Sequence, residues 1–331
     1  MPLAADGLWK QPRKLRKSLK KLLEDSSAAR VHQLRTRTRR MEAMVYALRL
    51  DSRKNERLLL KAIKPVRKKA GKVRDMDVLT GFASQPALND EKECTVRLLE
   101  HLGGQRELHA RKLEKVAAVQ APEIRRRLKR SARFLENALS PAKKTGKGRE
   151  WPTEAAALAL RLEAELRSWP ALNRRNLHPF RLRVKELRYV LQMAKDTDSE
   201  FIATLGEVKD AIGEWHDWEE LAGIAEELSQ HTGCKLLKEI HATAQDKFEH
   251  ALATTNRMRK SSLGTSTKGR RRRSSIQSIL LHFNSSLRES AVSAGVGPRA
   301  IQGSMKNCAT IIPIPYAACC VGNVVYRNLV R

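Results

Sequence analysis

Two segments of the sequence carry histidine and arginine at helical spacing and match each other in kind. VHQLRTRTRRMEAMVYAL begins at Val31, and LHPFRLRVKELRYVLQMA begins at Leu177. At an offset of 146 residues, the matched pairs are His32 and His178, Arg35 and Arg181, Arg37 and Arg183, and Arg39 and Lys185. Arginine offers paired donors to phosphate oxygens, and histidine is a compact donor whose charged form a polyanion favours. These residue types indicate the binding of an anion.

Apolar residues in both segments recur at the three- and four-residue intervals of a buried helix face. They are Val31, Leu34, Thr38, Met41, Val45 and Leu48 in the first segment, and Leu177, Phe180, Val184, Leu187, Leu191 and Ala194 in the second. A cation follows a core position by one residue at His32, Arg35 and Arg39 in the first segment and at His178, Arg181, Lys185 and Arg188 in the second. One residue is roughly 100° around a helix. Each predicted helix therefore carries a cationic stripe beside its core face, with successive cations about 5.4 Å apart. A polymer with a charge on every unit could run along such a ladder.

Other interpretations of the stripes stay open. A single histidine at the edge of a core is usually structural, and the arginines could form intramolecular salt bridges. The repeat favours anion binding, because two histidines at equivalent positions are each followed by Arg three residues later and by a cation seven residues later. A solvating face would lie opposite the core and mix Lys with Glu, whereas the first stripe has no acid before Glu42.

A second pair of segments matches at an offset of 142 residues, VRKKAGKVRDMDVL from Val66 and VKDAIGEWHDWEEL from Val208. The glycine of each segment, Gly71 or Gly213, suits a left-handed helix cap. The aspartates that follow, Asp75 and Asp217, then suit the start of the next helix. Alternatively, these aspartates orient the stripe arginines. Additional positive charge near the stripes could come from Arg67, Arg74, Lys209 and His216.

Composition narrows the function classes. The chain has 65 Lys plus Arg against 36 Asp plus Glu, a net charge of +29, which favours a polyanionic partner. Five cysteines without a CxxC pair or zinc-ligand spacing argue against a disulfide framework and a metal site, and fit a reducing cytoplasm. No signal peptide or membrane span is expected. Without a phosphate-binding GxxxxGK[ST] motif or catalytic constellation, we expect neither a cofactor nor enzymatic activity.

The fold class expected is all-α, because helical spacing runs to about Arg259 and strand alternation is absent. We expect helices at 8–24, 27–50, 53–70, 75–84, 90–118, 121–138, 153–168, 176–195, 199–212, 215–230 and 233–258. Pro, Gly and Lys predict a linker at 140–152, which divides a domain over 1–260 into halves at about 8–139 and 153–258. The basic, Ser-rich residues 261–331 are expected to form a disordered tail.

The matched segments resemble the CHAD family, the conserved histidine α-helical domain. The motifs that carry the resemblance are HQLRTRTRR from His32, VRDMDVL from Val73, HPFRLRVKELRY from His178 and IGEWHDWEEL from Ile212. With the flanking helices, the resemblance covers about residues 8–258. It implies two helical bundles related by a pseudo-two-fold, with basic side chains lining a central groove or pore. It also implies binding of inorganic polyphosphate and association with polyphosphate granules, where granule proteins are further possible partners.

When the family's binding residues are carried over by position, the resemblance implies a set of polyphosphate-binding residues: His32, Arg35, Arg39, Arg40, His178, Arg181, Lys185 and Arg188. Glu186 stands where the first copy has Arg40, so the second stripe is less basic there. The alternative function is a non-specific nucleic-acid-binding helical protein, which the net charge also fits. Aromatic residues make up only 5% of the chain, which leaves few platforms for stacking bases.

Overall fold

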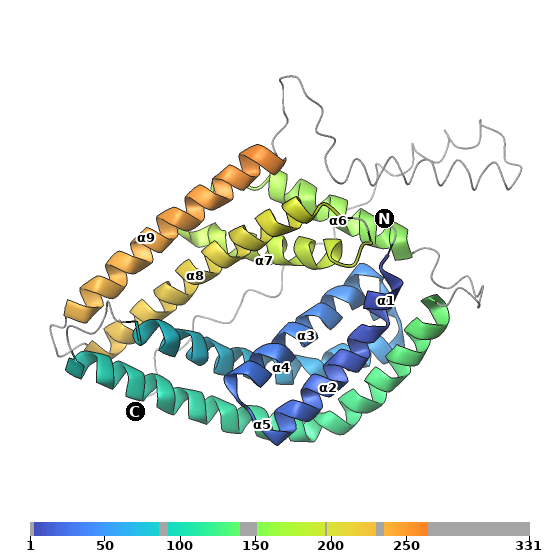
Figure 1. The fold of residues 1–331 in the computed structure, drawn as a ribbon, viewed down its shortest axis with the longest axis horizontal. Helices are drawn as coiled ribbons and strands as arrows, with labels where there is room; N and C mark the ends of the chain where they lie inside the picture. Colours follow the sequence, from blue (N-terminus) through green and yellow to red (C-terminus); the bar gives the residue numbers. More distant parts are fainter. Residues whose placement is uncertain (1–2, 86–91, 140–150, 196, 230–234, 264–331) are drawn as a thin grey trace, which may run out of the picture. The chain divides into compact units, whose positions relative to one another are not determined.

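The computed structural model describes residues 3–85, 92–139, 151–195, 197–229 and 235–263. Within these ranges the predicted all-α fold is confirmed, and the sole β feature is an isolated bridge between Leu3 and Ala194 (Figure 1). The chain divides into two units, 1–280 and 281–331, and the described residues all belong to the first. Most of the predicted linker, 140–150, and the predicted tail from 264 lie outside the described residues. No described helix is long and apolar enough to cross a membrane.

The helices fall into two halves that repeat one packing order. The first half contains α1 (Ala5–Leu8), α2 (Lys10–Glu24), α3 (Ala28–Ala47), the 3-10 helix η1 (Leu50–Ser52), α4 (Lys54–Ala83) and α5 (Lys92–Leu139). The second contains α6 (Trp151–Arg167), α7 (Arg174–Leu191), α8 (Ser199–Ser229), α9 (Lys235–Met258) and the π-helix η3 (Arg259–Leu263). In each half consecutive long helices pack on one another, and the halves meet where α3 contacts α7 and α4 contacts α8.

Three predicted helix breaks do not occur. The helix α4 continues through Gly71, α8 continues through Gly213, and α5 runs without interruption past Pro122. The capping roles predicted for Gly71, Gly213, Asp75 and Asp217 are therefore wrong. Buried side chains flank each glycine, so the core face of α4 and of α8 is continuous across it. Tertiary packing outweighs the local helix penalty of glycine, which is about 1 kcal/mol.

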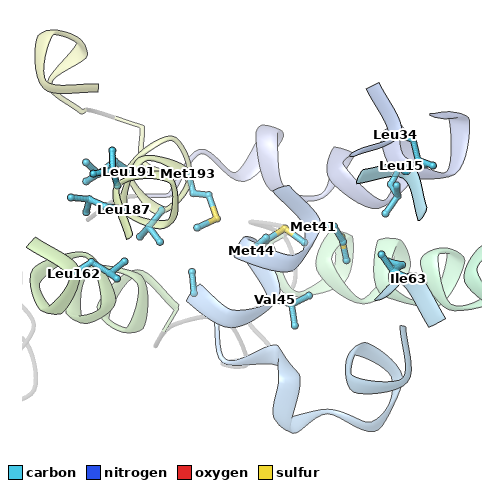
Figure 2. Close-up of a cluster of buried hydrophobic side chains, with 14 of the residues drawn as sticks. Leu15, Leu34, Met41, Met44, Val45, Ile63, Leu162, Leu187, Leu191 and Met193 are labelled. Carbon is cyan, nitrogen blue, oxygen red and sulfur yellow. The ribbon is translucent and has the colours of Figure 1, made fainter. Parts of the chain in front are cut away.

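The core stripes predicted for the two matched segments are confirmed, because every residue in both stripes is buried. Most of them join one apolar cluster that includes residues of both halves. Figure 2 shows Met44 and Val45 of α3 in this cluster, together with Leu187 and Leu191 of α7. Burial of these faces fixes the rotation of α3 and α7 about their axes. It therefore also fixes the direction in which the cationic stripes point.

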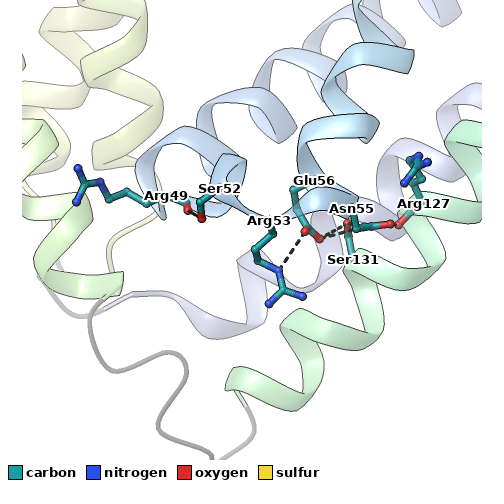
Figure 3. Close-up of polar contacts among 7 residues, drawn as sticks. All are labelled: Arg49, Ser52, Arg53, Asn55, Glu56, Arg127 and Ser131. Atoms are coloured by element: carbon teal, nitrogen blue, oxygen red, sulfur yellow. Dashed lines mark hydrogen bonds and ion pairs between the residues drawn. The ribbon is translucent and has the colours of Figure 1, made fainter. Parts of the chain in front are cut away.

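A buried carboxylate anchors the start of α4 to α5. Glu56 is 1% exposed and accepts hydrogen bonds from Asn55 Nδ2 at 3.1 Å and Ser131 Oγ at 2.9 Å (Figure 3). Its other oxygen accepts from Arg53 Nε at 3.1 Å, and the Arg53 guanidinium lies 3.3 Å from the ring centroid of Phe134. These partners offset the cost of burying the charge. The contact fixes the N-terminal end of α4, and the helix continues from there toward the cationic stripes.

One cysteine departs from the expectation drawn from the sequence. Cys94 on α5 is disulfide-bonded, and the other four cysteines lie outside the described residues. The odd number of cysteines argued against a disulfide framework, and the bond at Cys94 runs against that expectation. An odd number of cysteines leaves at least one unpaired, but it does not prevent the others from pairing.

The last described residues pack against α6 and the segment that follows it. Arg259 donates hydrogen bonds to the carbonyl of Trp169 and, at 3.3 Å, to the carbonyl of Pro170. Leu263, three residues beyond the predicted end of the domain, is 1% exposed and belongs to the main apolar cluster. Ordered packing thus extends at least to Leu263.

Two truncations should differ in stability because of Leu263. A chain that lacks residues 261–331 loses this side chain, whereas a chain that lacks 264–331 keeps it. We expect the first to be less stable by about 1.5–3 kcal/mol, the value of burying one leucine. Urea unfolding of both chains measures the difference, and Leu263→Ala in the longer chain should reproduce most of it. Equal midpoints for the two truncated chains would contradict the packing of Leu263.

Candidate anion-binding site

The two cationic stripes meet where α3, α4, α7 and α8 pack together, and Lys185 lies at their centre. Burial lowers the pKa of Lys185 to about 7, and the charges of Arg181, Arg35, Arg39 and Lys209 contribute to the same shift. These neighbours come from α7, α3 and α8, and therefore from both halves of the fold. No carboxylate of the described residues forms an ion pair with Lys185 or raises its pKa. We call this set of side chains the cationic cluster.

Two arginines of α7 are held on the surface of α8 by matched contacts. Arg181 Nε donates to the Lys209 carbonyl at 2.9 Å, and Arg188 Nε donates to the Ile202 carbonyl at 3.3 Å. Each guanidinium lies over a buried glycine that stands four residues after its carbonyl partner.

Of these two glycines, Gly213 is the one that the close approach of its arginine requires. A Cβ at residue 213 would lie 2.9 Å from Arg181 Cζ, which is closer than real contacts allow, whereas one at residue 206 would lie 3.5 Å from Arg188 Nε, an ordinary contact. The predicted role of Gly213 as a helix cap is thus replaced by a different one. The glycine forms a notch in which Arg181 rests.

Acidic residues orient the arginines of the first stripe. Arg35 Nη2 lies 3.9 Å from Asp75 Oδ1, while Arg39 and Arg67 each place a nitrogen 3.5 Å from Glu42 Oε2. In the second half Asp217 lies near Arg181: burial raises the pKa of Asp217, and the Arg181 charge opposes that rise. Asp75 is therefore placed to orient Arg35, whereas Asp217 is near Arg181 without an ion pair between the two side chains, so the predicted orienting role stays a prediction.

His178 and His32, the matched histidines of the two segments, differ in burial and in their neighbours. The rings of His178 and His216 are 4.1 Å apart, and His178 Nδ1 is buried without a hydrogen-bond partner. Burial, followed by the charges of His216, Arg181 and Lys185, lowers the pKa of His178 to about 4. His32 is exposed, and its pKa is lowered by partial burial and by the charge of Arg74, the repeat equivalent of His216. His178 is therefore neutral at pH 7 when no anion is bound.

Not every residue of the predicted site lies in the cationic cluster or beside it. The structure brings together His32, Arg35, Arg39, His178, Arg181, Lys185, Arg67, Arg74, Lys209, His216, Asp75 and Asp217. Arg188 lies two helical turns beyond Arg181 on α7, with its guanidinium over Gly206. Arg40 instead lines a pocket with Met44 and residues of the N-terminal segment. Arg40 directly follows Arg39, and one residue is roughly 100° around a helix, so the Arg40 side chain points away from the stripe.

Three kinds of residue in or beside this site were missed by reasoning from the sequence. Glu42 was recognised only as the first acid after the stripe, yet it pairs with two arginines. Tyr189 lies near enough to Arg39 and Arg181 to affect the pKa of both. The glycines gave a usable signal, because the seven-residue spacing of Gly206 and Gly213 equals that of Arg188 and Arg181.

The chemistry open to the cationic cluster is the binding of multiply charged anions. Partly buried like charges repel one another, and an anion that enters among them relieves the repulsion while it gains charge-assisted hydrogen bonds. Among the described residues, no group of three or more His, Cys, Asp or Glu side chains is placed to hold a metal ion. The cationic cluster is therefore suited to an anion that carries several negative charges.

Comparison with known proteins places the chain in a family. A solved structure with a similar fold is the CHAD domain from the plant Ricinus communis, which is 17% identical, with coverage of 85% of this chain and 91% of that chain and a TM-score of 0.47. No curated protein matches the chain in sequence. The model of the CHAD domain family matches residues 6–226, which is more than half of the 331 residues. The chain therefore belongs to the CHAD domain family.

Proposed function

We propose that the protein binds inorganic polyphosphate in the cationic cluster. The observation that carries this proposal is the environment of Lys185, where cations of both halves face one another and no described acid pairs with the lysine. The CHAD family is linked to polyphosphate binding, which supports the same ligand. A linear polymer of phosphates supplies a charge at each step along the paired stripes.

Geometry favours a polymer held by several arginines at once. The Nε atoms of Arg181 and Arg188 are used by backbone carbonyls, so each guanidinium is fixed in direction and keeps its other N–H groups for a ligand. Side chains that are oriented before binding lose less conformational entropy when the ligand arrives. His178 Nδ1, buried and unpaired, adds one more polar atom at this site.

The structure offers little for stacking bases, which supports polyphosphate over single-stranded nucleic acid. Trp151, Trp215 and Trp218 are buried, and Trp9 lies under the cations of Lys10 and Arg13. Of the aromatic side chains described, Tyr46 is the one that is largely exposed. Non-specific binders of single strands generally combine basic grooves with exposed aromatic rings.

The proposal gives the chain a binding role without catalysis. The CHAD domain is a helical binding domain and not a recognised enzyme family. We infer that polyphosphate draws the protein to cytoplasmic polyphosphate granules, where granule proteins could be further partners. Purified protein should neither hydrolyse nor extend polyphosphate, with or without magnesium or manganese.

A binding comparison tests the proposal directly. Long-chain polyphosphate, tripolyphosphate, duplex DNA and single-stranded RNA are compared at equal phosphate concentration and one ionic strength. We expect the long polymer to bind most tightly, and its affinity to fall as salt rises, because binding releases condensed counterions. If either nucleic acid fully displaced the long polymer at equal phosphate concentration, nucleic acid would replace polyphosphate as the proposed ligand.

Binding should also weaken as pH rises through neutrality. The pKa of Lys185 is about 7 in the free protein, so this lysine loses its charge as pH increases from 6 to 8. A bound polyanion favours the charged form, and binding near pH 7 should therefore take up protons. Titration calorimetry in buffers of different ionisation enthalpy measures this uptake.

Lys185→Arg is the matched control, because arginine stays charged throughout this pH range. Its affinity should vary less between pH 6 and 8 than that of the unmodified protein. A pH dependence that is unchanged in the variant would assign the proton uptake to another group, such as His178 or His216.

A further inference from the structure

A second basic surface lies on α2 and on the C-terminal part of α5, which pack side by side (Figure 1). The two helices run antiparallel, because Arg13 donates a hydrogen bond to Glu136 at 2.9 Å and Ser26 donates one to Glu114 at 2.6 Å. With 15 residues, α2 is roughly 22 Å long. The surface is therefore long enough to meet an extended partner.

Exposed cations gather on this surface with few acids among them. The residues of α2 include seven cations and one acid, Glu24. The equivalent helix of the second half, α6, has two cations and three acids, so the fold does not require a basic helix at this place. The exposed cations that form no ion pair within the described residues are Lys14, Arg16, Lys17, Lys20 and Lys21 on α2, and Arg125, Lys129, Arg130 and Arg133 on α5. We call this set the basic face.

A groove between the two helices brings cations of both together. Its volume is about 220 Å³, and its lining includes Arg13, Arg16, Lys129, Arg133 and Glu136. Glu136 is the one acid of the lining, and it is paired with Arg13. The other three cations are exposed and carry no ion pair within the described residues. A phosphate group at the groove can therefore accept charge-assisted hydrogen bonds from both helices at once.

The basic face is separate from the cationic cluster. Ser18 of α2 donates a hydrogen bond to the side chain of Gln33 on α3, at 3.2 Å. Gln33 precedes Arg35 by two residues, which is roughly 200° around a helix, so these two side chains lie on opposite sides of α3. The helix α2 thus covers the side of α3 that is turned away from the stripe. A partner on the basic face leaves the cluster residues open.

The cations of the basic face form two rows, one on each helix. Arg16 and Lys20 are four residues apart on α2, and Lys129 and Arg133 are four residues apart on α5, a spacing that places each pair on one side of its helix. Packed helices lie about 8–10 Å apart, which falls between the widths of the two grooves of B-DNA, about 6 and 12 Å. A duplex carries two rows of phosphates at such a separation, whereas a single polyphosphate chain carries one.

Two other polyanionic partners match this face less well. A helix that binds a membrane surface buries its apolar face in lipid, but Leu15, Leu19 and Leu22 of α2 are each 1% exposed and belong to the protein core. Proteins that bind single strands generally supply aromatic side chains for the bases, and no described aromatic side chain of α2 or α5 is exposed. Contacts to the phosphates of a duplex require neither feature.

We propose that the basic face binds the sugar–phosphate backbone of duplex nucleic acid, without sequence preference. Phosphates of one strand accept hydrogen bonds from the α2 row, and phosphates of the other strand accept from the α5 row. A duplex carries one charge for about each 1.7 Å of its axis, so a face roughly 22 Å long meets about a dozen phosphates. This binding is additional to the proposed function and does not depend on it.

The experiment measures the binding of a labelled DNA duplex of roughly 20 base pairs to the full chain, by fluorescence anisotropy at several salt concentrations and without polyphosphate. One variant replaces Arg16, Lys20, Lys129 and Arg133 with Gln. The charge-matched control replaces four exposed cations of the second half with Gln, which are Arg161, Arg175, Lys235 and Lys238. We expect the first variant to lose roughly tenfold or more in affinity. The slope of log affinity against log salt should fall by about 3–4, because each lost phosphate contact lowers it by about 0.9.

The control variant should change little in affinity or in slope. Equal losses in the two folded variants would mean that net charge alone attracts the duplex, and would overturn the proposal. Poly-L-glutamate and phosphatidylserine vesicles serve as competing probes at the same salt concentration. If either bound more tightly than the duplex and lost this binding in the first variant, the face would belong to an acidic protein or to a membrane. Should the fourfold variant not fold, the pairs Arg16→Gln with Lys20→Gln and Lys129→Gln with Arg133→Gln test each row, with about half the change in slope.

Discussion

Replacement of four cluster cations by glutamine should reduce polyphosphate affinity far more than replacement of four exposed lysines. The first variant changes Arg35, Arg39, Arg181 and Lys185, which converge from α3 and α7. The control variant changes Lys14, Lys17, Lys20 and Lys21, which are all exposed on α2. Both variants lose the same amount of charge, so a purely diffuse electrostatic attraction predicts similar weakening in the two.

The magnitude follows from the kind of contact that each variant removes. A hydrogen bond to a charged group contributes about 1.5–3 kcal/mol, and partial burial in the cluster reduces screening by solvent. Even if half of that contribution is lost to non-additivity, four such contacts amount to about 3–6 kcal/mol, or a loss of at least roughly 100-fold in affinity. Exposed lysines contribute mainly through counterion release, so the control should lose much less at moderate salt.

Affinity measured by fluorescence anisotropy with labelled long-chain polyphosphate decides between the two mechanisms. Each variant must first show the circular dichroism and the cooperative melting of the unmodified protein. Equal losses of affinity in the two folded variants would contradict the stripe model and would indicate binding by a generic basic surface. A larger loss in the α2 variant would move the binding site to that helix.

Much of the site could be predicted from the sequence because helix periodicity is local information. The spacing of Leu34, Met41 and Val45 determines which face of α3 is buried, and this face determines where Arg35 and Arg39 point. The same reasoning holds for α7, whose predicted core face is fully buried. Each stripe could therefore be predicted alone, together with the helices that carry it.

Other features depend on contacts between distant segments and could not be read from local patterns. The convergence of both stripes on Lys185 requires α3 to pack against α7, which periodicity does not specify. Gly71 and Gly213 resemble helix caps in sequence, yet both helices continue through them because their core faces do. The family resemblance placed Arg40 among the binding residues, but Arg40 lies one position further around α3 than Arg39 and lines a separate pocket.

Gly213→Ala should weaken polyphosphate binding without destabilising the protein. The new Cβ would lie 2.9 Å from Arg181 Cζ and 3.0 Å from its Nε, so the guanidinium must leave its position over α8. The clash involves the far end of a flexible side chain, and alanine is favoured over glycine inside a helix by up to about 1 kcal/mol. We therefore expect thermal stability to be unchanged or higher. Loss of the contacts that Arg181 makes should reduce affinity by roughly tenfold or more.

Two comparisons separate this mechanism from a general effect on α8. Gly223→Ala introduces the same methyl group into the same helix, where no other atom lies within 4 Å of the new Cβ, and it should leave affinity unchanged. In an Arg181→Gln background, Gly213→Ala should cause little further loss, because both changes remove the same contact and their effects are not additive. Full additivity in this double-mutant cycle would mean that Gly213 acts on binding through something other than Arg181. The notch would then be a feature of helix packing, and the affinity of the site would not depend on how Arg181 is held.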